Sequence, residues 1–231
     1  LTTIGPYAFY SCTSLTDVTI PEGVTSIGYG AFIGCFSITD ITIPDSVVEI
    51  GYAAFAGCLS LGEFKGKFAS DNGRCLIIDG VLNSFAAGCG ATDYTIPEDV
   101  TSIEHYAFCY SYLESVTIPN SVMNIGSYAF GDCRALREFK GKFAADNGRC
   151  LIIDGRLHYF ALGCGVTDYI IPDGVTAIED NAFNYCDSLA NITIPEGVTT
   201  IGQQAFWSCS NLLSVTFPDS LETIGTEAFG N

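Results

Sequence analysis

The side chains of this chain that are best suited to catalysis or metal binding are those of eleven cysteines and two histidines. Thiols and imidazoles at short spacing bind metals or form catalytic pairs, yet the sequence has no C-x-x-C or H-x-x-x-H motif. His105 aligns with Tyr29 at a variable position of a repeat, and His158 aligns with Asn83. No Ser, His and Asp pattern and no glycine-rich phosphate loop accompanies them. We therefore expect no metal site, no cofactor and no enzymatic activity.

Most of the cysteines follow a regular spacing that favours a structural role. Six of them come three residues after the phenylalanine of a recurring Ala-Phe pair, which places them in one inward column as small apolar core residues. These are Cys12, Cys35, Cys58, Cys133, Cys186 and Cys209. Two local pairs could form disulfides, Cys75 with Cys89 and Cys150 with Cys164, and we expect both to be reduced.

Composition excludes several classes of partner. Nine basic residues against 26 acidic ones give a formal charge of −17, which repels nucleic acids and anionic membrane surfaces. The chain is 48% hydrophobic, enough for a substantial core, but no apolar run is long enough to span a membrane. It begins at Leu1 without a charged-then-apolar leader, so we expect the export signal to lie outside this chain.

An internal repeat predicts the secondary structure that carries the cysteines and histidines. The unit from Leu15 to Cys35 reads L-x-x-V-x-I-P-x-x-V-x-x-I-G-x-x-A-F-x-x-C, and close copies recur along the chain. A unit this short cannot enclose its apolar residues alone, so successive coils must stack and bury a shared column. The repeat predicts a leucine-rich-repeat-like solenoid that is right-handed, with short parallel strands, little helix and about nine coils of 22 to 30 residues.

Within the first full coil, the apolar alternation over residues 15–20 predicts a strand that points Asp17 and Thr19 outward. Pro21 ends this strand because proline has no N–H to donate to a ladder. We expect residues 24–27 to run back along the opposite face of the coil. Stacked copies of the strand then form a parallel sheet.

Two longer repeats, residues 61–90 and 136–165, share the segment E-F-K-G-K-F-A-x-D-N-G-R-C-L-I-I-D-G. Asp79-Gly80 and Asp154-Gly155 each lie between apolar runs, which is a strong signal for a two-residue β-hairpin. We predict an irregular hairpin insertion in each long repeat. The whole of residues 1–231 is interpreted as a single solenoid domain with partial repeats at both ends.

The I-P-x-x-V-x-x-I-G-x-x-A-F-x-x-C core, intact at Ile20 to Cys35 and at Ile194 to Cys209, resembles the BspA-like leucine-rich repeats. The resemblance covers the whole chain, and the long variant is similar to the form in surface proteins of Bacteroides-type gut bacteria. It implies an exported, extracellular location at a bacterial cell surface, often with a lipid anchor, and adhesion to host proteins or neighbouring cells. It carries no ligand-contacting residue over to this sequence.

Outward strand positions form an acidic row beside a threonine-rich row, on the sheet that we expect to be concave and that solenoids use for binding. Carboxylates roughly 5 Å apart repel one another unless a lysine, a bound cation or a basic partner offsets them. The alternative is a solvated face, because threonine suits exposed strand positions. The predicted ligand-binding set is Asp17, Thr19, Asp40, Thr42, Glu63, Lys65, Asp93, Thr95, Thr117, Glu138, Lys140, Asp168 and Thr193.

Tyrosines recur just before the Ala-Phe pair, at Tyr7, Tyr29, Tyr52, Tyr106 and Tyr128. They form either an edge for stacking sugars or binding proteins, or half-buried cover for the core. We predict a non-catalytic cell-surface adhesion protein that recognises a surface protein of a host or neighbouring cell through its sheet. The alternatives are a carbohydrate-binding module that uses the tyrosines, and a structural stalk or spacer of a larger surface protein.

Overall fold

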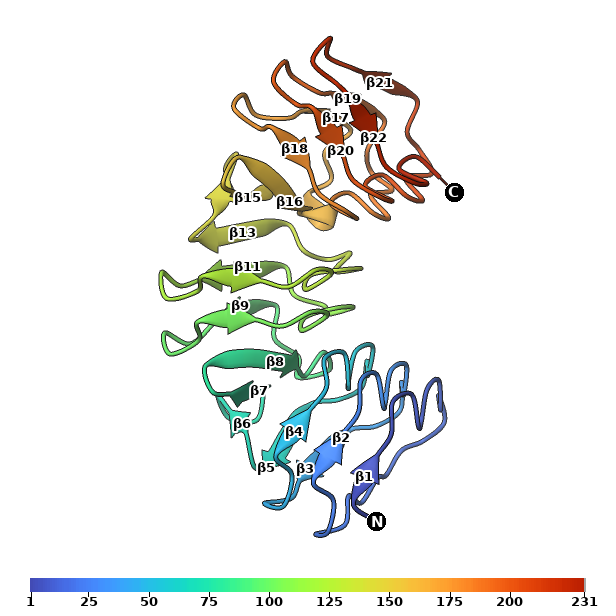
Figure 1. The fold of residues 1–231 in the computed structure, drawn as a ribbon, viewed down its shortest axis with the longest axis vertical. Coiled ribbons are helices and arrows are strands. Elements are labelled where there is room, and N and C mark those ends of the chain that lie inside the picture. The colour runs from blue at the N-terminus through green and yellow to red at the C-terminus, as the bar shows by residue number, and fades with distance from the viewer. Residues whose placement is uncertain (231) are drawn as a thin grey trace. The chain divides into compact units, whose positions relative to one another are not determined.

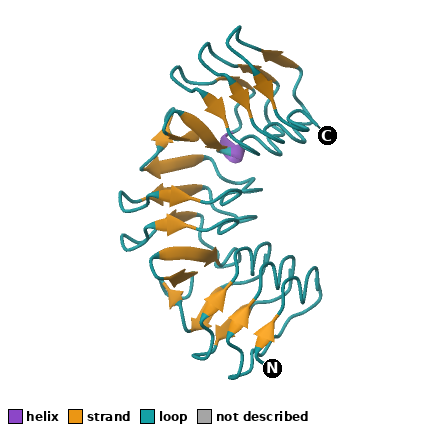
Figure 2. Cartoon of the chain, viewed as in Figure 1, coloured by secondary structure: helices purple, strands orange, loops and turns teal. Residues whose placement is uncertain are grey.

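The computed structural model describes residues 1–230, and strands joined by turns make up nearly all of this part of the chain (Figure 2). It is a β-solenoid of about 10 turns of roughly 23 residues, which confirms the predicted fold class. The count exceeds the nine expected coils because the partial first repeat also contributes a turn. The one helix among residues 1–230 is a short 3₁₀ helix, η1 (Leu162–Cys164), and no helix there could cross a lipid bilayer.

The turns form two compact units that interleave along the sequence. Unit 1 comprises Leu1–Thr92, Ile96–Tyr112 and Pro119–Gly131. Unit 2 comprises Asp93–Thr95, Leu113–Ile118 and the residues from Asp132 onward. That residues 1–231 act as a single domain stays a prediction.

The strands that precede each proline form the sheets that we call the front face. In unit 1, β3 (Asp40–Ile43) pairs in parallel with β5 (Glu63–Gly66). In unit 2, β9 (Asp93–Thr95), β11 (Ser115–Ile118) and β13 (Glu138–Gly141) lie side by side in one parallel sheet (Figure 1). A second parallel sheet of unit 2 contains β17 (Asp168–Ile170), β19 (Asn191–Thr193) and β21 (Ser214–Thr216). Exposed and buried residues alternate along β3, so Asp40 and Thr42 point outward as predicted.

The first predicted strand of this face does not form. Residues 15–20 carry no strand, so Asp17 and Thr19 lie exposed outside any ladder. Leu15 and Val18 are only partly buried against the core, whereas Ile38 and Ile41 of the next coil are buried. Alternation of apolar residues alone was therefore not sufficient to produce a paired strand here.

The opposite side of each coil is a ladder of two-residue strands that we call the back face, as predicted for residues 24–27. In unit 1, β1 (Thr3–Ile4), β2 (Ser26–Ile27) and β4 (Glu49–Ile50) pair in parallel, and so do β10 (Ser102–Ile103) and β12 (Asn124–Ile125). In unit 2, the ladder contains β18 (Ala177–Ile178), β20 (Thr200–Ile201) and β22 (Thr223–Ile224).

Both hairpins are present in the long repeats. They consist of β7 (Cys75–Ile78) with β8 (Val81–Phe85), and of β15 (Cys150–Ile153) with β16 (Arg156–Phe160). Short strands β6 (Ala69–Ser70) and β14 (Ala144–Ala145) pair with β7 and β15, respectively. Asp79 and Gly80 both have positive φ, at 50° and 78°, which is the type I′ geometry that a two-residue hairpin requires.

Each hairpin replaces a missing part of its coil. The strand β8 pairs in parallel with β10, and β16 pairs in parallel with β18, so the second strand of each hairpin joins the back face. This explains why the long repeats lack the Val-x-x-Ile stretch of the short ones. On its other side, β8 pairs antiparallel with its hairpin partner β7, so the ladder of β1, β2 and β4 ends before β8 and a new ladder begins there.

Stacked side chains form the core of each unit. In unit 1, the Phe32 ring stacks on Phe9 at 4.9 Å and on Phe55 at 5.4 Å, with the planes nearly parallel. In unit 2, Phe206 stacks on Phe183 at 4.7 Å and on Phe229 at 4.9 Å. The phenylalanine position of the repeat thus forms a stacked column in each unit, which supplies burial that a single coil lacks.

The cysteines pack as thiols next to these columns. All eleven are thiols rather than disulfides, and Cys12 is exposed instead of lying in the predicted inward column. The Cys35 thiol donates a hydrogen bond to the Phe9 carbonyl at 3.1 Å, and Cys58 donates to the Phe32 carbonyl at 3.2 Å. The cysteine column therefore satisfies backbone carbonyls of the preceding coil.

Candidate functional site

The structure distributes the predicted binding set over separate sheets. Thr117, Glu138 and Thr193 are half-buried. The other members are exposed: Asp17, Thr19, Asp40, Thr42, Glu63, Lys65, Asp93, Thr95, Lys140 and Asp168. In unit 1, Asp40 lies beside Glu63 and Thr42 beside Lys65. Asp17 and Thr19 lie outside these strands, so the structure brings together a smaller set than predicted.

Lysine offsets the acidic row of unit 1. Lys65 Nζ lies 3.1 Å from Asp40 Oδ1 and 2.8 Å from Glu63 Oε1, so one ammonium bridges two neighbouring strands. The hydrogen bonds to Glu63 and to Asp40 raise the pKa of Lys65 above its ordinary value. Because all three side chains are exposed, water and salt screen these pairs strongly.

An equivalent arrangement occurs on the β9–β11–β13 sheet of unit 2. Lys140 Nζ lies 2.8 Å from Glu138 Oε1 and donates to Ser115 Oγ at 3.2 Å. Ser115 Oγ in turn donates to Asp93 Oδ1 at 2.6 Å. The carboxylates of this sheet have partners within the protein, so the row does not need a bound cation or a basic ligand to offset it.

The remaining sheet of unit 2 uses neutral donors instead. Asp168 accepts hydrogen bonds from Thr167 Oγ1 at 2.8 Å and from Asn191 Nδ2 at 2.7 Å, and these bonds lower the pKa of the carboxyl group. Ile170 is the next outward-pointing residue of the same strand, and it is 70% exposed at a position where threonine recurs in other coils. This sheet is therefore less charged than the β3–β5 sheet.

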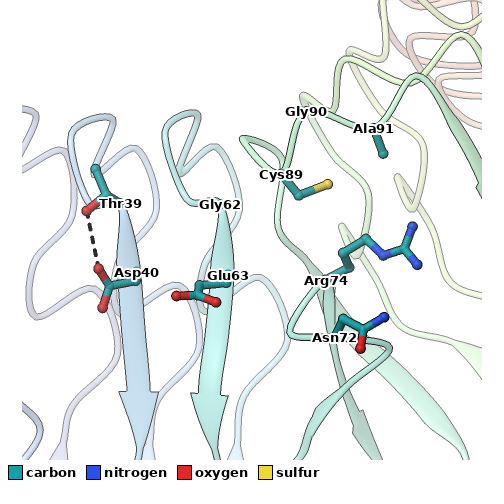
Figure 3. A pocket seen from close by; sticks show the side chains of 9 residues that line it. All are labelled: Thr39, Asp40, Gly62, Glu63, Asn72, Arg74, Cys89, Gly90 and Ala91. Carbon is teal, nitrogen blue, oxygen red and sulfur yellow. Dashed lines mark hydrogen bonds between the residues drawn. The ribbon is translucent and has the colours of Figure 1, made fainter.

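A hollow of about 580 Å³ opens beside the β3–β5 sheet of unit 1. Figure 3 shows Asp40 and Glu63 on adjacent strands at one side, and Asn72 and Arg74 of the long repeat at the other, with Cys89 near the rim. The rest of the lining is Thr39, Gly62, Gly90 and Ala91. Side chains of both charge signs thus border one exposed depression.

The turn of the long repeat positions the cationic side of this hollow. The Arg74 guanidinium contacts Asp71, with Nη2 2.9 Å from Oδ1 and Nε donating to the backbone carbonyl at 3.2 Å. The turn residues Asp71 and Asn72 both have positive φ, at 51° and 56°. Sequence reasoning did not join Arg74 to the acidic row. The signal that was available is the insertion itself, which begins on the strand that bears Glu63.

A second hollow of unit 1, of about 650 Å³, has an aromatic lining. Its walls are Tyr7, Tyr10, Tyr29, Ile33 and Tyr106. The ring centroids of Tyr7 and Tyr29 are 4.8 Å apart, and the rings are nearly perpendicular. A side-chain hydrogen bond with Tyr7, together with burial, raises the pKa of Tyr29.

The structure therefore collects three of the five predicted tyrosines, Tyr7, Tyr29 and Tyr106, around this hollow. The ring centroids of Tyr52 and Tyr29 are 4.3 Å apart, with tilted planes, and those of Tyr128 and Tyr106 are 5.2 Å apart, so Tyr52 and Tyr128 extend the aromatic cluster. Sequence reasoning missed Tyr10 and Ile33. Their signal was the short spacing from the predicted tyrosines, since Tyr10 is three residues after Tyr7 and Ile33 is four residues after Tyr29.

Reactive chemistry has little support at the thiols. Burial raises the pKa of Cys58 to about 12 and that of Cys186 to about 11, which disfavours the thiolate that acts as nucleophile or metal ligand. Burial also lowers the pKa of His158. Within residues 1–230, no group of three or more His, Cys, Asp or Glu side chains is arranged to hold a metal ion.

The sequence matches six copies of the BspA type leucine rich repeat region, over residues 1–69, 82–143 and 157–231. Most of each hairpin insertion lies in the two gaps of this match. No curated protein is similar enough to count as a relative.

Solved structures with the same fold include a leucine rich cell surface protein of Faecalibacterium prausnitzii, with 31% identity and a TM-score of 0.68. The match covers 95% of this chain but 58% of that protein, so the chain spans little more than half its length. A leucine-rich repeat protein of Eubacterium ventriosum matches at 22% identity and a TM-score of 0.53, covering 99% and 79% of the two chains. The pneumococcal vaccine antigen PcpA matches at 20% identity and a TM-score of 0.59, and the match covers 97% of this chain and 56% of that protein. The last two similarities concern the fold alone.

Proposed function

Because the chain belongs to the BspA-type leucine-rich repeat family, we propose that it is a non-catalytic cell-surface protein that binds a protein of a host or neighbouring cell. A protein that it resembles is described as a cell surface protein, which supports an extracellular location. We extend the proposal to export and attachment at the surface, by a lipid anchor or another route. The contact surface in this proposal is the front face, beginning with the β3–β5 sheet.

The observation that carries this proposal is the hollow beside β3 and β5. Asp40 and Glu63 border it on one side, and Arg74 borders it on the other, with a guanidinium that pairs with Asp71 and points away from the two carboxylates (Figure 3). A folded protein surface presents both charge signs, and arginine is enriched at protein interfaces, so such a site suits a polar protein partner. A polyanion is a poor fit because the chain carries a net charge of −17.

The test measures binding of the purified chain to an array of extracellular-matrix and cell-surface proteins at low and high salt. The variant Asp40→Asn/Glu63→Gln keeps side-chain size and removes two charges from the hollow. We expect it to reduce binding at least tenfold and to flatten the salt dependence, because rim charges act through screened electrostatics. Glu22→Gln/Asp45→Asn removes two exposed carboxylates from unit 1 outside the front face and serves as the matched control.

Two outcomes contradict the proposal. One is the absence of any protein that the wild-type chain binds reproducibly. The other is equal binding by the front-face variant and the control. A structural stalk or spacer, the alternative that makes no contact through either face, predicts the first outcome.

A further inference from the structure

The aromatic hollow of unit 1 is exposed to an extent that core cover does not require. Tyr7 is 47% exposed, Tyr10 is 58% exposed and Tyr52 is 44% exposed. In contrast, Phe32 and Phe55 of the adjacent column are buried. The core is therefore closed without these tyrosine rings, and their burial against it is incomplete. This leaves ring surface available to a ligand.

Two of these tyrosines stand at a position of the repeat whose backbone conformation is the same in the other coils. Tyr7 and Tyr106 occupy the residue just before the Ala-Phe pair, with φ of 57° and 61°. A left-handed conformation is unfavourable for a bulky residue and suits glycine or asparagine. Gly30, Ala53 and Gln204 occupy the same position in other coils, with φ of 60°, 57° and 53°. The repeat imposes this conformation on whichever residue stands there, so the path of the backbone does not require tyrosine rings at Tyr7 and Tyr106.

The lining also restricts the chemistry of the ligand. None of the five lining residues carries a charge, and the four tyrosines present ring surfaces together with phenolic hydroxyl groups. Ring faces attract flat, weakly polar surfaces, and the hydroxyls donate and accept hydrogen bonds at their rim. The net charge of −17 opposes an anionic ligand. A neutral ligand with apolar faces and hydroxyl edges satisfies all three conditions.

A β-linked glucose unit has this shape. Its ring substituents are all equatorial, so both faces of the ring expose only C–H groups, while hydroxyls surround the edge. The hollow has a volume of about 650 Å³, within the range of small-ligand sites, and it is bordered by further rings at Tyr52 and Tyr128. An extended chain of sugars suits such an open surface better than a single enclosed molecule.

We infer that the Tyr7, Tyr10, Tyr29, Ile33 and Tyr106 hollow binds a neutral, β-linked glucose-type oligosaccharide. Sugar rings stack on the exposed tyrosines, and the phenolic hydroxyls bond to the equatorial hydroxyls of the ligand. This activity goes beyond protein binding by the front face, and it involves different residues. Its success or failure is therefore separate from that of the proposed function.

The experiment titrates the purified chain with cellohexaose and follows intrinsic fluorescence and heat of binding. The double variant Tyr7→Asn/Tyr106→Asn removes two rings and installs the residue that unit 2 has at this position in Asn181. The left-handed backbone favours asparagine, so the variant should fold. We expect saturable binding by the wild-type chain and at least a tenfold loss in the double variant.

The matched control is Gln204→Asn/Glu227→Asn, which makes the same kind of change at the same position of unit 2, where φ is 53° and 54°. It should bind cellohexaose like the wild type. A second variant, Tyr29→Gln, copies Gln203 of unit 2 and should also weaken binding. Circular dichroism and thermal unfolding of every variant verify that the fold is retained.

Three outcomes overturn the inference. The first is no saturable binding of cellohexaose by the wild-type chain up to about 1 mM. The second is equal affinity in the tyrosine variants and the control. The third is preferential binding of a heparin hexasaccharide or an oligoarginine peptide that depends on the same tyrosines, since either would identify a charged ligand.

Discussion

The corner before the Ala-Phe pair differs between the two units in its side chains but not in its backbone. Unit 1 has Tyr106 at this position with φ of 61°, and unit 2 has Asn181 with the same φ. In unit 2, Gln204 Nε2 bonds to Glu227 Oε2 at 2.8 Å across two neighbouring corners, whereas in unit 1 Tyr106 contacts Tyr128 ring to ring. The repeat thus dictates the path of the chain, and the variable residues decide the chemistry of each surface.

If the two units have equivalent cores, the loss of a core phenylalanine should destabilise the protein equally in either unit. We expect this to be the largest effect. Phe32→Ala and Phe183→Ala each remove a completely buried ring from a stacked column. We expect each to lower the free energy of unfolding by about 3–5 kcal/mol. Denaturant unfolding followed by circular dichroism provides the measurement. A much smaller loss for one of the two would show that the columns are not equivalent.

The dependence of stability on alkaline pH also tests whether the cores of the two units are equivalent, because each contains buried thiols. Burial raises the pKa of Cys58 in unit 1 and of Cys209 in unit 2 to about 12, from an ordinary value of 9.0. A raised pKa in the folded state stabilises the fold below pH 9, and this contribution is lost as the pH rises from 9 towards 12. We expect stability to fall over that window, and Cys58→Ala and Cys209→Ala to flatten the fall to a similar degree. A profile that neither substitution alters would contradict the prediction.

Substitution of the glycine that follows the back-face strand of a coil tests whether the coils pack equally closely in the two units. A Cβ added at Gly51 would lie 2.5 Å from the backbone nitrogen of Tyr29, and one at Gly225 would lie 2.6 Å from that of Gln203. Gly51→Ala and Gly225→Ala should each cost about 1–3 kcal/mol, because the neighbouring backbone must move. Gly5→Ala, where nothing lies within 4 Å, is the control. Thermal unfolding that is insensitive to Gly51→Ala would show that the coils separate easily.

The smallest effect on stability is expected on the front face. Lys65→Gln and Lys140→Gln remove the exposed ammonium groups that contact Glu63 and Glu138. Water screens these pairs, so the melting temperature should hardly change in either unit. Binding of a basic probe peptide should instead increase at low salt, because the carboxylates lose their partners. A marked drop in melting temperature would assign these lysines a structural role.

Sequence patterns were sufficient for the repeating parts of this protein. Apolar residues recur at fixed spacing, so stacking of one coil on the next predicted the solenoid and the columns. Asp79-Gly80 predicted a hairpin because both residues tolerate positive φ, and the structure has them at 50° and 78°. The strand expected at residues 15–20 was wrong, since its pattern does not reveal how completely a neighbouring coil covers it.

By itself, the sequence determined the coil, its inward columns and the outward direction of Asp40 and Thr42, because burial repeats with the coil. Only the tertiary structure decided which polar side chains meet. The hairpin insertion brings Arg74 to the hollow that Glu63 borders, and Lys65 links Asp40 to Glu63. Such contacts depend on the path of a bulged segment and on the rotamers of exposed side chains, which no periodic pattern encodes.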